Sequence, residues 1–119
     1  MQKINLAEKL GRFAERWSPK IIAELNGQQV KLVKSLGAFP WHFHEHEDEL
    51  FLVVRGTLRM EFRDRAVVLQ EGEMIVVPRG VEHRPVAEAE VCLLLSEPAS
   101  PVNPGSAGGV HTVAKPDWI

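Results

Sequence analysis

Apolar and polar residues alternate with a period of two over much of this chain, which is the pattern of half-buried β-strands. The alternation is regular in residues 57–63, where three apolar side chains share one face. Residues 49–54 are apolar on both faces after the first position, as expected for a strand that is covered on both sides. An Asn26-Gly27 pair between two earlier apolar runs predicts a hairpin turn, because type I′ turns need positive φ at both positions.

The two ends of the chain follow other patterns. Asn5 stands three residues before Glu8, as in a helix-capping box, and Leu6 and Leu10 share one helical face. We therefore expect a short N-terminal helical segment over residues 1–17. Residues 97–119 are rich in proline and glycine but keep several apolar side chains, which predicts an extended arm that packs on its own barrel or on a partner subunit.

The strands between these ends predict the fold class. They are short, nearly evenly spaced and separated by glycine-containing turns, as in a sandwich or small barrel. We expect one all-β domain over residues 1–119, with its barrel over residues 20–96. A chain of 119 residues is long enough to bury a modest core without disulfide bonds.

Composition excludes several classes of function. The net charge is −2 without a basic cluster, so we expect no nucleic-acid partner. The apolar runs are far too short to span a bilayer, so we expect no membrane partner. The single cysteine, Cys92, lies in an apolar run and is expected to be a buried, inert thiol. With no possible internal disulfide and no secretory signal at the N-terminus, we expect a cytoplasmic protein.

Imidazole and carboxylate groups are concentrated in two segments, 41–49 (WHFHEHEDE) and 78–83 (PRGVEH), which hold four of the five histidines. These are ligand types of divalent transition metals. His42 and His44 would project from the same face of a strand. Glu49 has the wrong parity to join them on one straight strand, so a turn over residues 45–48 would have to bring it opposite on an antiparallel strand. His83 could arrive from a third strand.

The same residues resemble the two motifs of the cupins, which are small β-barrels of jelly-roll topology, also called the double-stranded β-helix. The first motif is similar to the run Gly37, His42-Phe43-His44, Glu49 and Gly56, and the second to the run Gly72, Pro78-Arg79-Gly80 and His83. The chain departs from the usual pattern in having four residues between Gly37 and His42 and an alanine at position 87.

The resemblance implies a ligand set of His42, His44, Glu49 and His83, and therefore one divalent ion (Mn, Fe, Ni, Co, Cu or Zn). Two register alternatives exist, because His44 and His46 also form a His-x-His pair and Asp48 is also a carboxylate. The motif spacing favours His42 with His44. His46 is then expected to be a surface residue or an acid or base at the pocket rim.

Four protein ligands would leave positions open for a small-molecule substrate. We expect either a metal-dependent enzyme acting on a small oxygen-rich molecule, as a sugar or sugar-acid isomerase, a lyase or a dioxygenase, or a non-catalytic binding or sensing module. Candidate catalytic groups near the motif are His46, Glu47 and Arg55. The second apolar face of residues 50–54 and the aromatic side chains at 39, 41 and 43 also predict a homodimer.

Overall fold

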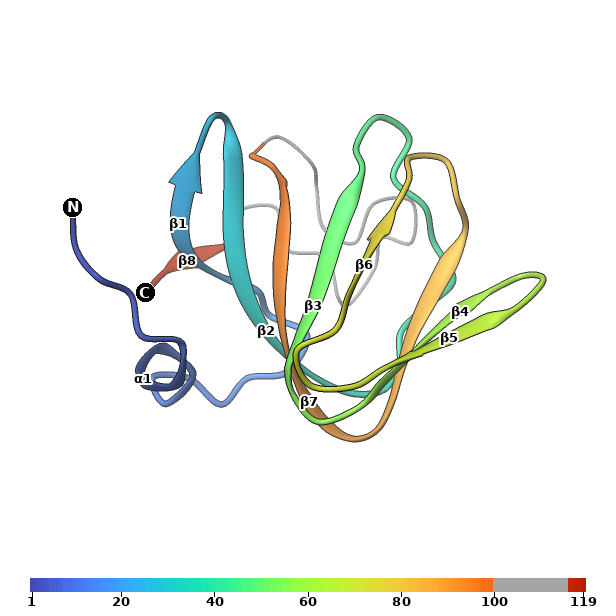
Figure 1. Cartoon of the computed structure of the whole chain (residues 1–119), viewed down its shortest axis with the longest axis horizontal. Coiled ribbons are helices and arrows are strands. Elements are labelled where there is room, and N and C mark those ends of the chain that lie inside the picture. Colours follow the sequence, from blue (N-terminus) through green and yellow to red (C-terminus); the bar gives the residue numbers. More distant parts are fainter. Residues whose placement is uncertain (100–115) are drawn as a thin grey trace.

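The computed structural model describes residues 1–99 and 116–119. One short helix, α1 (Leu6–Leu10), precedes a set of strands that form one twisted and rolled sheet (Figure 1). The strands are β1 (Lys20–Leu25), β2 (Gln28–Ala38), β3 (Glu49–Arg55), β4 (Leu58–Phe62), β5 (Ala66–Leu69), β6 (Met74–Val77), β7 (His83–Pro98) and β8 (Asp117–Trp118).

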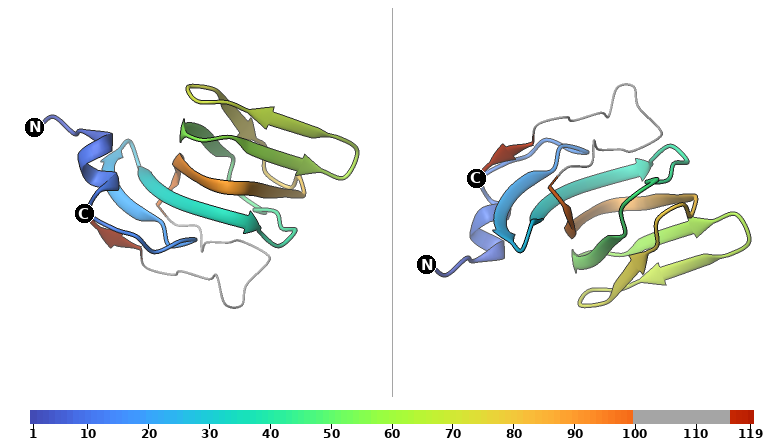
Figure 2. Two further views of the ribbon diagram at one scale, coloured as in Figure 1. Left: turned by 90° about the horizontal axis from the view of Figure 1, so that it is seen from below. Right: turned by 90° about the horizontal axis from the view of Figure 1, so that it is seen from above.

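Strand β7 organises the barrel because its two halves have different partners. Along one edge β7 pairs with β2 over both halves, and along the other edge its first half pairs with β4 and its second half with β3. β6 continues the sheet beyond β3, and the β4–β5 hairpin projects at the end of the molecule opposite α1 (Figure 2). This is the jelly-roll β fold that the sequence predicted.

The local signals at the N-terminus act as expected. Asn5 is the N-cap of α1 and accepts a hydrogen bond from the Glu8 amide at 3.0 Å. Asn26 and Gly27 both have positive φ, 50° and 78°, so the hairpin between β1 and β2 turns as a type I′ pair predicts. In the described part of the chain, no helix is long and apolar enough to cross a membrane.

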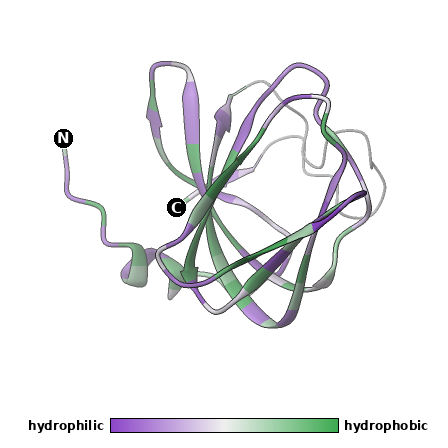
Figure 3. Cartoon of the chain, turned by 45° about the vertical axis from the view of Figure 1, so that its right-hand side comes forward, coloured by the Kyte–Doolittle hydropathy of each residue, from purple (hydrophilic) through white to green (hydrophobic). Residues whose placement is uncertain are grey.

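Hydropathy follows the strands. Hydrophobic colour runs along the crossing strands of the barrel, and hydrophilic colour gathers at the turns that connect them (Figure 3). One core fills the barrel, and a second lies between α1 and the outer face of the sheet. Cys92 is buried in the second core, as its apolar run predicted.

The C-terminal segment differs in part from the expectation. Strand β7 continues through Pro98, past the barrel boundary expected at residue 96, so Glu97 lies in the barrel and is buried. Residues 117–118 form β8, which pairs in parallel with β1 of the same chain. This end of the expected arm therefore packs on its own barrel. The part of the arm at 100–115 lies outside the described residues.

Candidate metal centre

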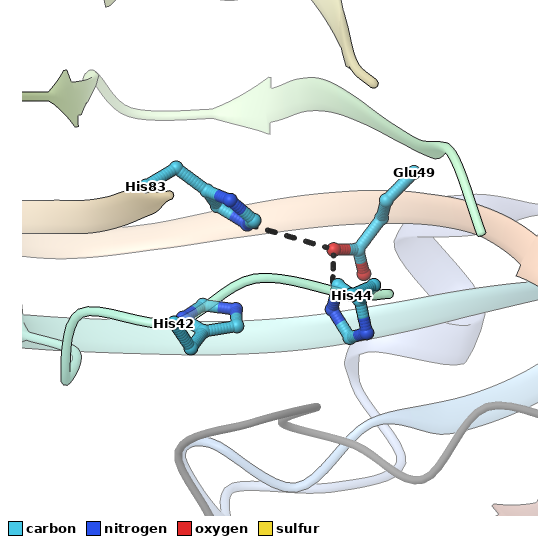
Figure 4. A group of neighbouring side chains, drawn as sticks. All are labelled: His42, His44, Glu49 and His83. Carbon is cyan, nitrogen blue, oxygen red and sulfur yellow. Dashed lines mark ion pairs between the residues drawn. The ribbon is translucent and has the colours of Figure 1, made fainter. Parts of the chain in front are cut away.

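Three separate segments bring four ligand-type side chains to one point inside the barrel (Figure 4). His42 and His44 lie between β2 and β3, Glu49 is the first residue of β3, and His83 is the first residue of β7. One ligand atom from each residue lies within 4.8 Å of the others. All four side chains are buried.

The backbone differs from the expectation over residues 42–44. These residues form no regular strand, and a single antiparallel bridge joins His42 to His83 through two hydrogen bonds of 3.1 and 2.9 Å. The expected alternation still holds, because His42 and His44 are buried whereas Phe43 is 36% exposed. The sequence suggested that β3 pairs with this segment. In the structure β3 pairs with β6 and β7 instead.

The loop that follows the histidines is fixed to the second motif. The backbone amide of Gly80 donates to the His44 carbonyl at 2.8 Å. Asp48 accepts from the Arg79 amide at 2.9 Å and from its guanidinium at 3.2 and 3.4 Å. These hydrogen bonds hold the turn that places Glu49 beside His44. The Asp48 carboxylate is therefore engaged by Arg79 and lies outside the cluster.

Hydrogen bonds to backbone carbonyls set the orientation of two imidazoles. Nδ1 of His42 lies 2.9 Å from the Pro40 carbonyl, and Nδ1 of His83 lies 2.9 Å from the Val81 carbonyl. A carbonyl oxygen only accepts, so each Nδ1 carries the proton and each Nε2 is left with a free lone pair. This outer contact is the one that ligating histidines commonly make.

The Nε2 atoms of His44 and His83 are buried and have no hydrogen-bond partner among the described residues. His44 Nε2 lies 3.2 Å from Glu49 Oε1, and His83 Nε2 lies 3.9 Å from the same oxygen. The first distance is short, but the two atoms do not have the angles of a hydrogen bond. The two imidazole nitrogens and the Glu49 oxygen therefore face a shared space. Buried polar atoms without partners are rare in folded proteins and require an explanation.

Burial keeps the three imidazoles neutral. It lowers the pKa of His42 to about 3, with a further contribution from His83, and it is also the main cause that lowers the pKa of His44 and of His83. Neutral imidazole is the form that binds metal. Burial also raises the pKa of Glu49 to about 7, and a bound cation would favour its charged form.

Two further polar residues lie behind Glu49, and the sequence did not predict a role for either. Glu97 shares a side-chain hydrogen bond with Glu49, and Lys31 donates to Glu97 at 3.0 Å. Both Lys31 and Glu97 are completely buried. Burial, then the charge of Glu49, raises the pKa of Glu97 to about 8. Two carboxyl groups in hydrogen-bond contact must share a proton, so Glu97 can donate to Glu49.

The remaining candidates are not members of the buried cluster. The His46 side chain is 79% exposed and faces Glu45 at 3.8 Å. Arg55 is exposed at the end of β3, and Glu47 is half-buried in the loop. The structure therefore brings together His42, His44, Glu49 and His83, and leaves His46, Asp48 and Arg55 outside the cluster.

The donor set fits one divalent ion. Three neutral imidazoles and one carboxylate converge on a shared space, and two of the imidazole nitrogens lack any other described partner. Ligand distances near 2.1 Å place opposite ligands about 4.2 Å apart, close to the observed separations. The set holds no thiolate, which is typical of Mn, Fe, Co, Ni, Cu and Zn sites built on nitrogen and oxygen.

A cavity adjoins the cluster, and both His42 and Glu49 line it. Its other lining residues are apolar except for one serine. They are Trp17, Pro19, Val33, Ser35, Phe39, Phe51, Pro85, Leu93 and Leu95. Strand parity could have indicated part of this lining, because Val33 and Ser35 share a face of β2, and Leu93 and Leu95 share a face of β7.

Comparisons with known proteins agree with this architecture. A crystal structure of a cupin-2 domain containing protein from Shewanella frigidimarina NCIMB 400 is 49% identical, with a TM-score of 0.79 over 80% of this chain and 93% of that one. Protein NMB1881 from Neisseria meningitidis is 39% identical, with a TM-score of 0.75 over 82% and 100% of the two chains. The uncharacterized protein YdbB of Bacillus subtilis (strain 168) is 33% identical over 81 residues, or 67% of this chain and 72% of YdbB.

The sequence profile described as the cupin domain, of the Cupin_2 family, matches residues 29–96. This range contains both motifs and all four residues of the buried cluster. The chain therefore belongs to the cupin domain family.

Proposed function

We propose that this protein is a divalent-metal-dependent enzyme that acts on a small oxygen-bearing molecule, as an isomerase, a lyase or a dioxygenase. The observation that carries the proposal is the convergence of His42, His44, Glu49 and His83 on one space, with two buried imidazole nitrogens that have no other described partner. A divalent ion held there supplies a Lewis acid that polarises a substrate oxygen.

The protein's own residues have defined tasks in this proposal. The Pro40 and Val81 carbonyls hold His42 and His83 with Nε2 directed at the centre. The Asp48–Arg79 contact fixes the turn before Glu49. The apolar cavity wall adjoins His42 and Glu49 on the substrate side.

A non-catalytic binding or sensing module is the second candidate, and one observation favours it. Apart from His42 and Glu49, the described lining of the cavity offers a single polar side chain, Ser35. His46, Glu47 and Arg55 do not line it. An isomerase or lyase needs a group that moves a proton, so within the described lining this task would fall to Glu49 or Ser35.

Metal content and turnover test the proposal together. Protein purified without chelator is expected to hold about one divalent ion per chain, and His42→Ala is expected to lose the ion and any turnover found in a screen of sugars, sugar acids, 2-oxo acids and diphenols, with O₂ uptake recorded. His46→Ala is the matched control, because its side chain is exposed, and it should keep both. Stoichiometric metal without turnover of any class would favour the binding module. Protein that binds no divalent ion would contradict the enzyme and any module that holds its ligand through a metal.

A further inference from the structure

The cavity beside the cluster is built for an apolar group. Trp17, Phe39 and Phe51 contribute aromatic rings to its wall, and valine, leucine and proline side chains complete it. The ring centroids of Trp17 and Phe39 lie 4.8 Å apart, and those of Phe39 and His42 lie 5.1 Å apart. A continuous aromatic wall therefore leads from Trp17 to the proposed metal ligand.

Trp17 is held in a strained backbone conformation at this wall. Its φ is 58°, a left-handed value that is unusual for a bulky residue. The Trp17 amide donates to the Lys34 carbonyl at 2.8 Å, and its indole nitrogen donates to the Leu36 carbonyl at 3.1 Å. Strain of this kind persists only where the surrounding structure enforces it, and it is concentrated at ligand sites.

One buried polar atom in the wall has no partner. Ser35 is completely buried, and its Oγ makes no hydrogen bond to any described residue. Because an unsatisfied buried hydroxyl is costly, this position is suited to one polar atom of a ligand. It cannot satisfy the several hydroxyl groups of a sugar.

The cavity is small. About 40 Å³ of it is open to the centre of a water molecule. A single water needs roughly 10–15 Å³ of such volume. The space is therefore that of about three heavy atoms, as in a short branched alkyl group.

We propose that this cavity is a substrate subsite that accepts a short apolar substituent, so that the ligand is a small molecule with an oxygen-bearing head at the His42–Glu49 end and an alkyl tail between Trp17, Phe39 and Phe51. The assignment of the head rests on the proposed metal function, and the assignment of the tail rests on the cavity alone. The proposed subsite excludes polyhydroxylated sugars from the substrate class.

Hydroxamates provide probes with one metal-binding head and different tails. Their dissociation constants would be measured by calorimetry on Co²⁺-loaded protein. Isobutyrohydroxamate is expected to bind at least about fivefold more tightly than acetohydroxamate, because each buried methylene contributes about fourfold in affinity. Glycerohydroxamate, whose tail carries two hydroxyl groups, is expected to bind more weakly than acetohydroxamate. Equal affinities, or a preference for the hydroxylated tail, would overturn the proposal.

Two tryptophan variants test whether the preference for the branched alkyl tail arises in this cavity. Trp17→Ala is expected to reduce the isobutyro-to-aceto ratio below about twofold while Co²⁺ still binds. Trp118→Ala is the matched control, because Trp118 is 58% exposed on β8 and does not line the cavity, and it should keep the wild-type ratio. If the Trp17 variant does not fold, the wild-type series still decides the question.

A probe that needs no metal separates this proposal from the metal function. Crystals of metal-free protein under xenon pressure are expected to show one xenon atom between Trp17, Phe39 and Phe51, because dry apolar cavities bind xenon. A xenon site in protein that binds no divalent ion would keep the apolar subsite and remove the proposed function. Metal binding without a xenon site and without a preference for the alkyl tail would keep the proposed function and remove the apolar subsite.

Discussion

Glu97 lies behind the proposed metal ligand Glu49 and connects it to a buried lysine. The Glu97 carboxyl contacts Glu49 on one side and accepts from Lys31 at 3.0 Å on the other. Groups that hydrogen-bond to ligating side chains orient them, and their loss commonly costs tenfold to a hundredfold in metal affinity. We therefore regard Glu97 as a positioning residue.

Substitutions at Glu97 test this role. Glu97→Gln keeps an acceptor for Lys31 and a donor for Glu49, so its affinity for Zn²⁺ is expected to stay within about threefold of wild type. Glu97→Leu is expected to lose at least about tenfold. It should also lose about 3–5 kcal/mol of unfolding free energy, because Lys31 becomes a buried unpaired charge. Chelator competition and urea unfolding measure the two effects.

The double variant Lys31→Met/Glu97→Leu separates positioning from stability. Replacing both members of the pair with apolar residues should restore most of the unfolding free energy. Zn²⁺ affinity should stay as low as in Glu97→Leu. If metal affinity returned together with stability, Glu97 would have a structural role only.

Residue spacing predicted which side chains lie in the cluster but not what lies behind them. Strand parity placed His42 and His44 on one face, and the resemblance to the family motifs implied the full set with Glu49 and His83. Glu97 was placed in the arm, because prolines and glycines follow it closely. Its contact with Lys31 depends on the register between β2 and β7, where Lys31 pairs with Leu95 and Gln29 with Glu97. Local periodicity contains no information on that long-range register.

At the scale of the elements, alternation predicted β4, which has a buried face, and a continuous apolar run predicted β3, whose second face is half-buried. Burial also alternates over residues 42–44, but the expected strand does not form there, because Pro40 has no amide donor and the chain has already left β2 at Ala38. The partner expected for β3 was also wrong, because β3 pairs with β6 and β7, which come much later in the sequence. The short helix and its cap could be predicted, because capping is local.

The turn between β3 and β4 gives a prediction at this scale. Gly56 has φ 91°, and an added Cβ would lie 3.0 Å from the Glu90 carbonyl and 3.3 Å from Val91 Cα. Gly56→Ala is therefore expected to cost about 3 kcal/mol, from left-handed strain and overpacking together. Gly72→Ala is the control, because it has φ 81° but open space around it, and it should cost only about 1–2 kcal/mol. Equal losses in urea unfolding would show that the close approach to β7 has no energetic effect.

For the whole molecule, an apolar outer surface supports the proposed homodimer. Leu50 and Leu52 on the outer face of β3 pair with Val76 and Met74 of β6. Val76 and Met74 are 49% and 53% exposed. The N-terminal segment covers a different part of the sheet, where Val54 and Leu94 pack against the second core. Contiguous exposed apolar surface of this kind marks interaction sites.

Size-exclusion chromatography with light scattering tests the dimer. We expect twice the 13.3 kDa chain mass. Val76→Lys should give monomer, because it places a charge in the centre of this surface. Val68→Lys on β5, where Val68 is also about half exposed, is the control and should remain dimeric. A monomeric wild-type protein at micromolar concentration would contradict the homodimer.

The buried carboxyl groups predict how stability depends on pH when metal is absent. The pKa values of Glu49 and Glu97 are raised to about 7 and about 8, whereas unfolded glutamate titrates near 4.3. Between these values the folded chain holds protons that the unfolded chain has released, so stability falls as pH rises. Below about pH 6.5 the buried histidines have the opposite effect on stability. Their pKa values are lowered in the folded chain, so they stay neutral there while the unfolded chain binds protons, and stability rises with pH.

Chelated protein should therefore be most stable near pH 6.5 and lose about 1 kcal/mol of unfolding free energy between pH 6 and pH 8, because the histidines offset most of the carboxyl contribution. Saturating Zn²⁺ should abolish or reverse this loss, because a bound cation favours the deprotonated carboxylate. Thermal unfolding across this range, with and without Zn²⁺, measures both curves. A metal-free protein that becomes more stable from pH 6 to pH 8 would contradict the assignment of buried, proton-sharing carboxyl groups.

The central claim is that four side chains of this barrel hold one divalent ion. Anomalous diffraction from a crystal of protein saturated with Zn²⁺ or Mn²⁺, measured at the edge of that metal, tests it most directly. We predict one strong peak per chain inside the barrel, bound by Nε2 of His42, His44 and His83 and by the Glu49 carboxylate. A peak bound instead by His46 or Asp48, or no peak inside the barrel, would contradict it.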